Sequence, residues 1–275
     1  MSLVDDIRSQ AFPNGKGSKT VDEMQLEKIF NAMFYKDKNI EEEAKFVKQV
    51  MTRGLESQER VGLHASAMIV GDKQFCVRQQ VLSLLYKQLQ GEQVNVDLMR
   101  IFEQGNAIHE KWQRLFIRAG YAKAEDCDLT RFDKKYEMSF TPDVIITIPE
   151  FCPDPMVVEI KSVNTYQFQK MEHHSSGEKQ CQFYMNRTGL KKGLTLCEDK
   201  NTQQFKIRLL DYDSSVTDPF VERLEEVKYY KNKAIKEHKM VKRHCDCKSA
   251  DCKMASQCPM KDACWNVGMG RIKLK

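Results

Sequence analysis

The spacing of apolar positions along the chain predicts two kinds of secondary structure. Apolar residues recur three or four positions apart across 76–90 and 98–119, which is the spacing of amphipathic helices. Other stretches are short, apolar and rich in β-branched side chains, which favours strands. These predicted strands cover residues 136–140, 142–148, 156–163, 193–198 and 204–211. Because helices precede and interrupt the strands, the pattern predicts an α/β fold.

The same pattern divides the chain into three parts. Residues 1–60 are predicted to form a helical N-terminal appendage, because VDEMQLEKIFNAMFY and IEEEAKFVKQVMTRGL can each place apolar residues on one helical face. Residues 61–218 contain the predicted strands and are interpreted as the core. Within them HHSSGEK, residues 173–179, is predicted to be a surface loop. Residues 219–275 are predicted to form a long charged helix over 219–244 and a cysteine-rich tail.

Composition and charge narrow the class of protein only a little. A hydrophobic content of 41% in 275 residues supports a substantial core. The net charge of +5 allows a local basic groove but does not by itself indicate nucleic acid. MSLVDDIRSQ lacks the apolar segment of a signal peptide, and no run approaches the length of a membrane-spanning helix. We therefore expect a cytoplasmic protein (in the host cytoplasm if the source is viral) without membrane contact.

Charged residues interrupt two of the predicted strands in a pattern that indicates chemistry. In MVVEIKSV, Glu159 and Lys161 are two positions apart on a strand, so both point to the same face. Asp143 opens the preceding apolar run and should lie beside Glu159. Two carboxylates at that distance repel unless a cation lies between them. Mg²⁺ or Mn²⁺ takes carboxylate oxygens and polarises a phosphate, and Lys161 could orient or deprotonate the attacking water or stabilise the transition state.

This arrangement resembles the PD-(D/E)xK nuclease superfamily. Pro142 and Asp143 match the PD, and the segment from Glu159 to Lys161 matches the ExK. Two further features resemble the RecB-like and Cas4-like exonucleases. One is a histidine in FEQGNAIHEKWQRLF, a helical segment before the strands. The other is QCQFY, whose Gln and Tyr are four positions apart on one helical face and match a QxxxY motif. These residues are His109, Gln180 and Tyr184.

The resemblance implies a fold and a role for each matched residue. The implied fold is a restriction-endonuclease-like core, with a mixed central sheet flanked by helices. The implied catalytic residues are Asp143, Glu159 and Lys161, and the implied DNA contacts are Gln180 and Tyr184. The implied ligands of Mg²⁺ or Mn²⁺ are His109, Asp143, Glu159 and the carbonyl of Ile160.

Five of the ten cysteines lie in the tail RHCDCKSADCKMASQCPMKDACW. Thiols at this density in a reducing compartment predict soft-metal ligands rather than disulfides. In Cas4-like and AddB-like nucleases, one N-terminal and three C-terminal cysteines hold a [4Fe–4S] cluster. The resemblance implies that set here, with two alternates because Ala255 occupies a place where the family commonly has cysteine. The implied ligands are Cys76, Cys252, Cys258 and Cys264, with Cys245 and Cys247 as alternates.

Zinc is the competing interpretation of the same tail. Cys245, Cys247, Cys252 and Cys258 could form a local Zn²⁺ site with four thiolates. The iron–sulfur interpretation is preferred because it alone uses Cys76 and Cys264.

The sequence as a whole predicts a Mg²⁺- or Mn²⁺-dependent deoxyribonuclease. We expect an exonuclease on DNA ends or single strands, in recombination, replication or repair, with a stand-alone chain fitting a phage or mobile element. Expected partners are DNA, recombination or replication proteins, and further copies of the chain. The alternative is a catalytically silent DNA-binding or complex-forming protein of the same fold.

Overall fold

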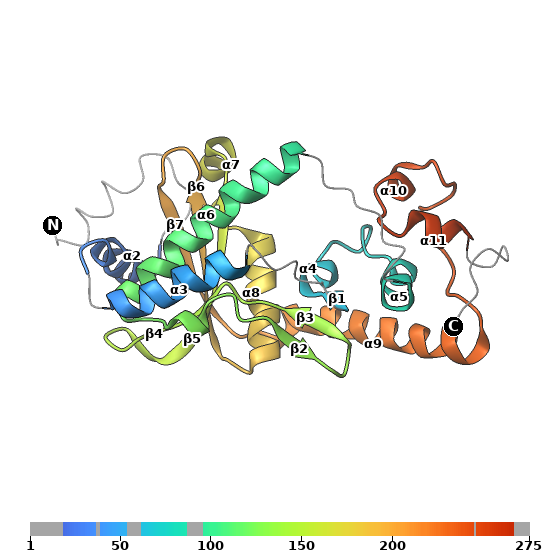
Figure 1. Cartoon of the computed structure of the whole chain (residues 1–275), viewed down its shortest axis with the longest axis horizontal. Coiled ribbons are helices and arrows are strands. Elements are labelled where there is room, and N and C mark those ends of the chain that lie inside the picture. Colours follow the sequence, from blue (N-terminus) through green and yellow to red (C-terminus); the bar gives the residue numbers. More distant parts are fainter. Residues whose placement is uncertain (1–18, 37–38, 54–61, 87–95, 245, 267–275) are drawn as a thin grey trace.

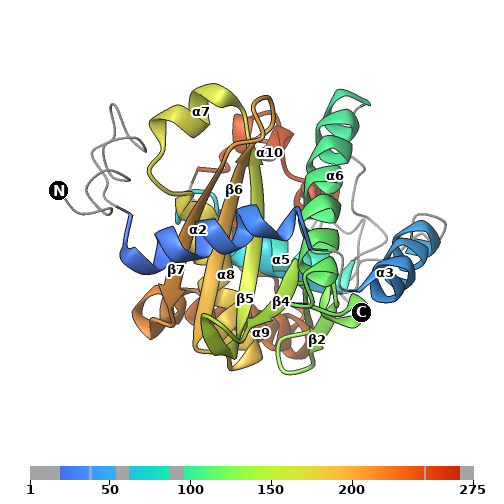
Figure 2. The ribbon, with the colours of Figure 1, turned by 90° about the vertical axis from the view of Figure 1, so that its left-hand side faces the viewer.

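The computed structural model describes residues 19–36, 39–53, 62–86, 96–244 and 246–266 (Figure 1). At its centre lies a four-stranded sheet with the strand order β4-β5-β6-β7. The β5–β6 pair is parallel and the two outer pairs are antiparallel. Helices cover this mixed sheet (Figure 2), which confirms the predicted fold class. The strands are β4 (Val144–Ile148), β5 (Cys152–Val163), β6 (Lys192–Asp199) and β7 (Phe205–Asp211).

A smaller three-stranded sheet has the order β1-β3-β2. Its strands are β1 (Leu63–His64), β2 (Arg131–Asp133) and β3 (Met138–Phe140). The chain enters β1 at Gly62, whose φ is +79° and where a Cβ would lie 2.0 Å from the carbonyl oxygen of Glu137. Only glycine fits this approach. Glu137 itself has a φ of 51°, so the strand predicted at 136–140 starts only at Met138.

Helices from distant parts of the chain cover the two faces of the central sheet. Helices α2 and α6 pack on one face, with α3 against the outer side of α6. Helix α8 packs on the opposite face and α9 packs against α8. Their bounds are α2 (Val21–Met33), α3 (Ile40–Arg53), α6 (Val96–Arg118), α8 (Ser175–Thr188) and α9 (Ser214–Glu237).

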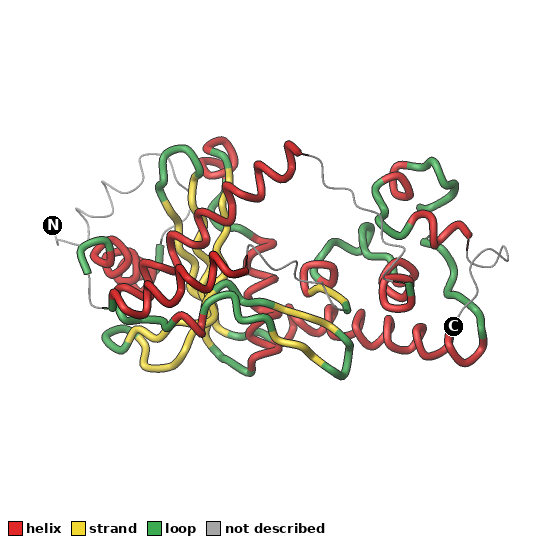
Figure 3. The backbone as a smooth tube through the Cα atoms, viewed as in Figure 1, coloured by secondary structure: helices red, strands yellow, loops and turns green. Residues whose placement is uncertain are grey.

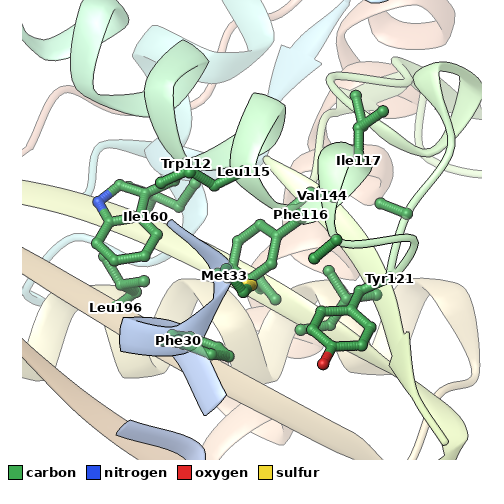
Figure 4. Close-up of a cluster of buried hydrophobic side chains, with 14 of the residues drawn as sticks. Phe30, Met33, Trp112, Leu115, Phe116, Ile117, Tyr121, Val144, Ile160 and Leu196 are labelled. Atoms are coloured by element: carbon green, nitrogen blue, oxygen red, sulfur yellow. The ribbon is translucent and has the colours of Figure 1, made fainter. Parts of the chain in front are cut away.

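The core between α2, α6 and the sheet is rich in aromatic side chains (Figure 4). Trp112 is fully buried, and its ring centroid lies 5.0 Å from that of Phe205 in an edge-on arrangement. Phe30 of α2 meets Phe116 of α6 edge-on at 5.1 Å. Such pairs add to the free energy gained from burial alone. Part of the predicted appendage therefore packs in the same core as the sheet, and the division at residues 60 and 218 stays a prediction.

The opposite end of the molecule consists of short helices and loops around one end of α9 (Figure 3). α5 packs against α9, and α11 packs against α5. The short helices at this end are α4 (Ala65–Met68), α5 (Val77–Leu85), α10 (Lys253–Ser256) and α11 (Lys261–Asn266). At the other end, α7 (Thr165–Lys170) packs against β6, and a 3₁₀ turn at Ala124–Asp126 packs against α3 and β4. No helix in the described ranges is both long enough and apolar enough to cross a membrane.

Three predicted segments differ from the structure for local reasons. The charged helix predicted over 219–244 runs instead from Ser214 to Glu237. Its start is capped by Asp213, whose side chain accepts the Ser215 N–H, and it ends because His238 is left-handed, with φ 52°. The helix predicted over 76–90 ends at Leu85, and 87–90 lie outside the described residues. Most of the loop predicted at 173–179 is the first part of α8.

A buried ion pair fixes α3 to α6. The carboxylate of Glu43 accepts from Arg114 Nε at 2.8 Å and from Arg118 Nε and NH2 at 2.8 and 2.7 Å. The side chain of Glu43 is only 10% exposed. These bonds, that of Arg118 first, lower the pKa of Glu43. A lowered pKa stabilises the fold above the unfolded pKa, and this contribution is lost as the pH falls through the folded pKa.

We expect Glu43→Gln to reduce the free energy of unfolding by about 1.5–3 kcal/mol at pH 7, because hydrogen bonds to charged groups are worth that much. At pH 3.5 the difference from the wild type should shrink, because protonation removes the same charge. Urea denaturation at both pH values measures this, with exposed Glu41→Gln of the same helix turn as the control. An equal destabilisation at both pH values would contradict the ion-pair explanation.

Candidate functional site

Asp143 is held at the start of β4 by three contacts from two directions. Its Oδ2 accepts the Ile160 N–H of β5 at 2.6 Å. Its Oδ1 lies 3.3 Å from His109 Nδ1 of α6, and its carbonyl oxygen accepts from Gln113 Nε2 at 2.7 Å. Burial alone would raise the pKa of Asp143, but the interaction with His109 outweighs it and the pKa is lowered. The sheet and α6 together thus aim one carboxylate at the middle of β5.

Glu159 lies beside Asp143 on β5 and is almost inaccessible to solvent. Its side chain is 1% exposed, and Lys161 Nζ lies 2.6 Å from its Oε1. Neither carboxylate oxygen has a hydrogen bond of good geometry. Burial, followed by the charge of Asp143, raises the pKa of Glu159 to about 8. Lys161 offsets only part of the cost of this buried charge, so a second cation between the two carboxylates would stabilise the ionised form.

These residues fit a hard divalent cation by their chemistry. The carboxylates of Asp143 and Glu159 are neighbours, and the imidazole of His109 lies 3.3 Å from that of Asp143; together they form a donor set that Mg²⁺ or Mn²⁺ accepts. Within the described residues, no group of three or more His, Cys, Asp or Glu side chains is already arranged as a metal site. Side-chain adjustment would therefore have to accompany binding. Ile160 contacts the site through its N–H, which donates to Asp143 Oδ2, and its carbonyl as a metal ligand stays a prediction.

Lys161 is joined to α8 through a short chain of hydrogen bonds. Its Nζ donates to Gln180 Oε1 at 3.1 Å, and Gln180 Nε2 donates to the hydroxyl of Tyr184 at 2.8 Å. Tyr184 is 4% exposed and its ring stacks on Phe140. Gln180 is half-buried. The two predicted DNA contacts therefore differ. Gln180 contacts Lys161 at the site, whereas Tyr184 is buried and contacts the site through its hydrogen bond with Gln180.

His174 also lies at this site, although the sequence predicts a surface-loop histidine there. It is the N-cap of α8, and its Nδ1 accepts the Gly177 N–H at 3.0 Å. A Cβ on Gly177 would lie 3.1 Å from His174 Nδ1 and 3.2 Å from Lys161 Cγ. The first turn of α8 thus brings His174 beside Lys161. The sequence does not predict this position of His174 at the start of α8, because histidine is not a preferred N-cap residue.

We expect Gly177→Ala to destabilise the protein by about 1–3 kcal/mol, because the added methyl group overpacks the contact between α8 and Lys161. The sign is informative, since glycine to alanine within a helix is otherwise stabilising by up to about 1 kcal/mol. Ser175→Ala, in the same turn and exposed, is the control and should be neutral or stabilising. Denaturant unfolding measures both, and a stabilised Gly177→Ala variant would contradict the close packing.

The cysteines of the tail gather at the far end of the molecule, around Cys76. Cys264 of α11 accepts from Arg78 Nε through its Sγ at 3.2 Å. Burial raises the pKa values of Cys76 and Cys258, and a charge on Cys264 raises both further. Burial and Cys252 raise the pKa of Cys247 to about 11, with Cys264 and Cys76 adding to it. Cys247, Cys258 and Cys264 thus lie near Cys76, Cys252 lies beside Cys247, and Cys245 lies outside the described residues.

These thiols fit a soft metal or cluster by their chemistry. Thiolates this close repel one another, and a bound cation removes that penalty. Cys252 is also prepared as an acceptor, because its Sγ receives the Ala255 N–H at 3.4 Å and this bond lowers its pKa. The remaining cysteines are elsewhere, and those at 127, 181 and 197 are buried.

No family model matches the chain, and no curated protein matches it. Similar solved structures include SSO0001, at 14% identity and a TM-score of 0.45 over 78% of this chain and 95% of that one. Another is the alkaline exonuclease LHK-Exo of Laribacter hongkongensis in complex with dAMP, at 18% identity and a TM-score of 0.43 over 64% and 94%. A phage-related exonuclease from Haemophilus somnus 129PT has 15% identity and a TM-score of 0.45 over 66% and 98%. At these identities and TM-scores, the similarity does not by itself assign an activity to this chain.

Proposed function

We propose that the chain is a deoxyribonuclease of the PD-(D/E)xK type, which uses Mg²⁺ or Mn²⁺ to hydrolyse phosphodiester bonds. The observation that carries this proposal is Glu159. Its carboxylate is buried next to Asp143, and neither oxygen has a hydrogen bond of good geometry. Structural carboxylates do not need that arrangement, whereas a metal-binding site does. The motif resemblance of His109, Asp143, Glu159 and Lys161 points to the same chemistry.

Each residue of the site has a role that follows from its contacts. Asp143, Glu159 and His109 would hold the metal, which when bound polarises the phosphate and makes a bound water more acidic. Ile160 N–H and His109 fix the orientation of the Asp143 carboxylate. Lys161 Nζ, held between Glu159 and Gln180, is placed to orient the attacking water or to stabilise charge on the phosphate.

We further propose that the substrate is DNA with a free end, or a single strand, so that the enzyme is an exonuclease. Supporting this, Tyr229 of α9 is 58% exposed with Lys233 Nζ 5.7 Å from its ring centroid. An exposed aromatic ring beside a cation is suited to stacking on an unpaired base near a phosphate. Partners in recombination, replication or repair, and association with further copies of the chain, belong to the same proposal.

The cysteine group is proposed to hold a [4Fe–4S] cluster through Cys76, Cys252, Cys258 and Cys264, with Cys245 and Cys247 as alternates and zinc as the alternative metal. Its role would be structural, since it would join α5 to α10 and α11, which are distant in sequence. All described cysteines are free thiols, which accords with a reducing cytoplasm, that of the host if the source is viral.

The test is cleavage of end-labelled single- and double-stranded DNA with Mn²⁺, using protein purified without oxygen. Asp143→Asn should abolish the cleavage seen with the wild type. Asp154→Asn is the matched control, because Asp154 is an exposed carboxylate on the same strand β5. Its activity should equal that of the wild type, and the label released first would give the polarity. A folded wild type that binds DNA but cleaves none would instead establish the silent DNA-binding protein.

A further inference from the structure

His174 occupies a position that capping α8 does not fully explain. One ring nitrogen, Nδ1, accepts the Gly177 N–H at 3.0 Å and lies 3.2 Å from Ser176 Oγ. Because Nδ1 accepts from a backbone N–H, the proton of the neutral ring is on Nε2. Burial, followed by the charge of Lys161, lowers the pKa of His174, which favours the neutral ring. Among the described residues, no hydrogen-bond partner is recorded for Nε2.

The polar groups around His174 are of two kinds, and strand alternation places Glu159 and Lys161 on the same face of β5. The carboxylates of Asp143 and Glu159 suit a cation. Lys161 Nζ and the N–H at Nε2 of His174 are both donors. The close approach at Gly177 holds the Lys161 and His174 side chains together, since both lie within 3.2 Å of where its Cβ would be. A group placed beside these donors, with a cation bound at the carboxylates, would have the environment that a phosphate requires.

We propose that His174 is a further catalytic residue of this site, whose Nε2–H donates a hydrogen bond to a non-bridging oxygen of the scissile phosphate. This rests on the proposed nuclease function and adds a substrate contact that the matched motifs do not contain. Capping and phosphate binding use different ring nitrogens, so His174 performs both at once. The capping hydrogen bond then also serves catalysis, because it fixes the tautomer of the His174 ring and the direction in which its Nε2–H points.

Two substitutions separate the cap from the donor. His174→Asn keeps a side-chain oxygen that can cap α8, since asparagine is a preferred N-cap residue, but its amide does not extend to the position of Nε2. His174→Gln extends to that position with an N–H donor but caps poorly. The control is His173→Asn, because His173 is the neighbouring, exposed histidine.

The measurements are single-turnover cleavage of labelled DNA with Mn²⁺, binding of the same DNA with Ca²⁺, and thermal unfolding. We expect His174→Asn to unfold like the wild type and to cleave about a hundredfold more slowly, as for loss of one transition-state donor. His174→Gln should retain more activity than His174→Asn although it unfolds at a lower temperature. The effect on the single-turnover rate should be larger than the effect on DNA binding.

The proposal is overturned if His174→Asn cleaves like the wild type, or if activity follows stability across the variants, because His174 is then only a cap. If the wild type cleaves no DNA, the nuclease proposal fails, and the binding measurement decides alone. If His174→Asn then binds DNA more weakly than His173→Asn does, the proposed contact between His174 and a phosphate is supported. If the two variants bind DNA equally well, that contact is contradicted.

Discussion

A Glu159→Gln variant will lose Mn²⁺-dependent cleavage by a factor on the order of 10³, and without metal it will unfold at a temperature no lower than the wild type does. The two results follow from one feature. The Glu159 carboxylate is 1% exposed and lies beside Asp143, and its ion pair with Lys161 offsets only part of the cost of its charge, so its pKa is raised to about 8. Glutamine resembles the neutral carboxyl that this pKa favours without metal, and it keeps an oxygen that can accept from Lys161.

Another carboxylate buried in this sheet, that of Glu198, provides the matched control. Glu198 is also 1% exposed, but it accepts from Lys111 Nζ at 2.6 and 2.7 Å and from Trp112 Nε1 at 2.6 Å. Glu198→Gln should therefore lower the free energy of unfolding by about 1.5–3 kcal/mol, because it weakens satisfied charge-assisted bonds. The contrast between the two variants separates a binding carboxylate from a structural one.

Thermal unfolding with and without Mn²⁺ completes this test. The wild type should unfold at a higher temperature when Mn²⁺ is added, because an ion that binds only the folded state stabilises it. Glu159→Gln should lose most of that shift. A variant that is destabilised like Glu198→Gln, or that still responds fully to Mn²⁺, would show that Glu159 has a structural role and does not bind metal.

Cys76→Ser is expected to produce the largest loss of stability among the variants considered. The other described members of the cysteine group lie 171 to 188 positions after Cys76 in the sequence. Loss of a ligand would release the segment that carries α10 and α11 from α5. The loss of several kcal/mol should lower the unfolding temperature by about 10 °C. The visible absorption of the anaerobically purified protein should disappear with it.

Metal analysis of the same variant distinguishes the two interpretations of the tail. An iron–sulfur cluster that uses Cys76 would be lost, whereas a local zinc site built from the tail alone would remain. Cys152→Ser is the control, because Cys152 is a partly exposed thiol on β5 outside the group. Hydrogen exchange over residues 246–266 should increase in Cys76→Ser alone. If Cys76→Ser keeps its full metal content and an unchanged tail, Cys76 is not a ligand.

The apolar pattern was sufficient for the two inner strands because β5 and β6 are buried on both faces of the sheet over residues 156–160 and 193–199. β5 is the clearest case, because five consecutive residues, 156–160, are buried. A short buried run of this kind is typical of a strand that is covered on both faces. The alternation of strand side chains also placed Glu159 and Lys161 on one face without knowledge of the fold. Helix ends were predicted less well, because they depend on single residues such as Asp213 and the left-handed His238.

The sequence by itself determined the fold class and the carboxylates, lysine and cysteines that carry the candidate chemistry, because strand alternation and residue type are local properties. Only the tertiary structure decided that His109 reaches Asp143, that His174 lies beside Lys161, and that Cys76 meets the tail. It also distinguished Glu159 from Glu198, two equally buried carboxylates on neighbouring strands. The physical reason is that the compensation of a buried charge depends on partners from distant segments, and packing alone brings those segments together.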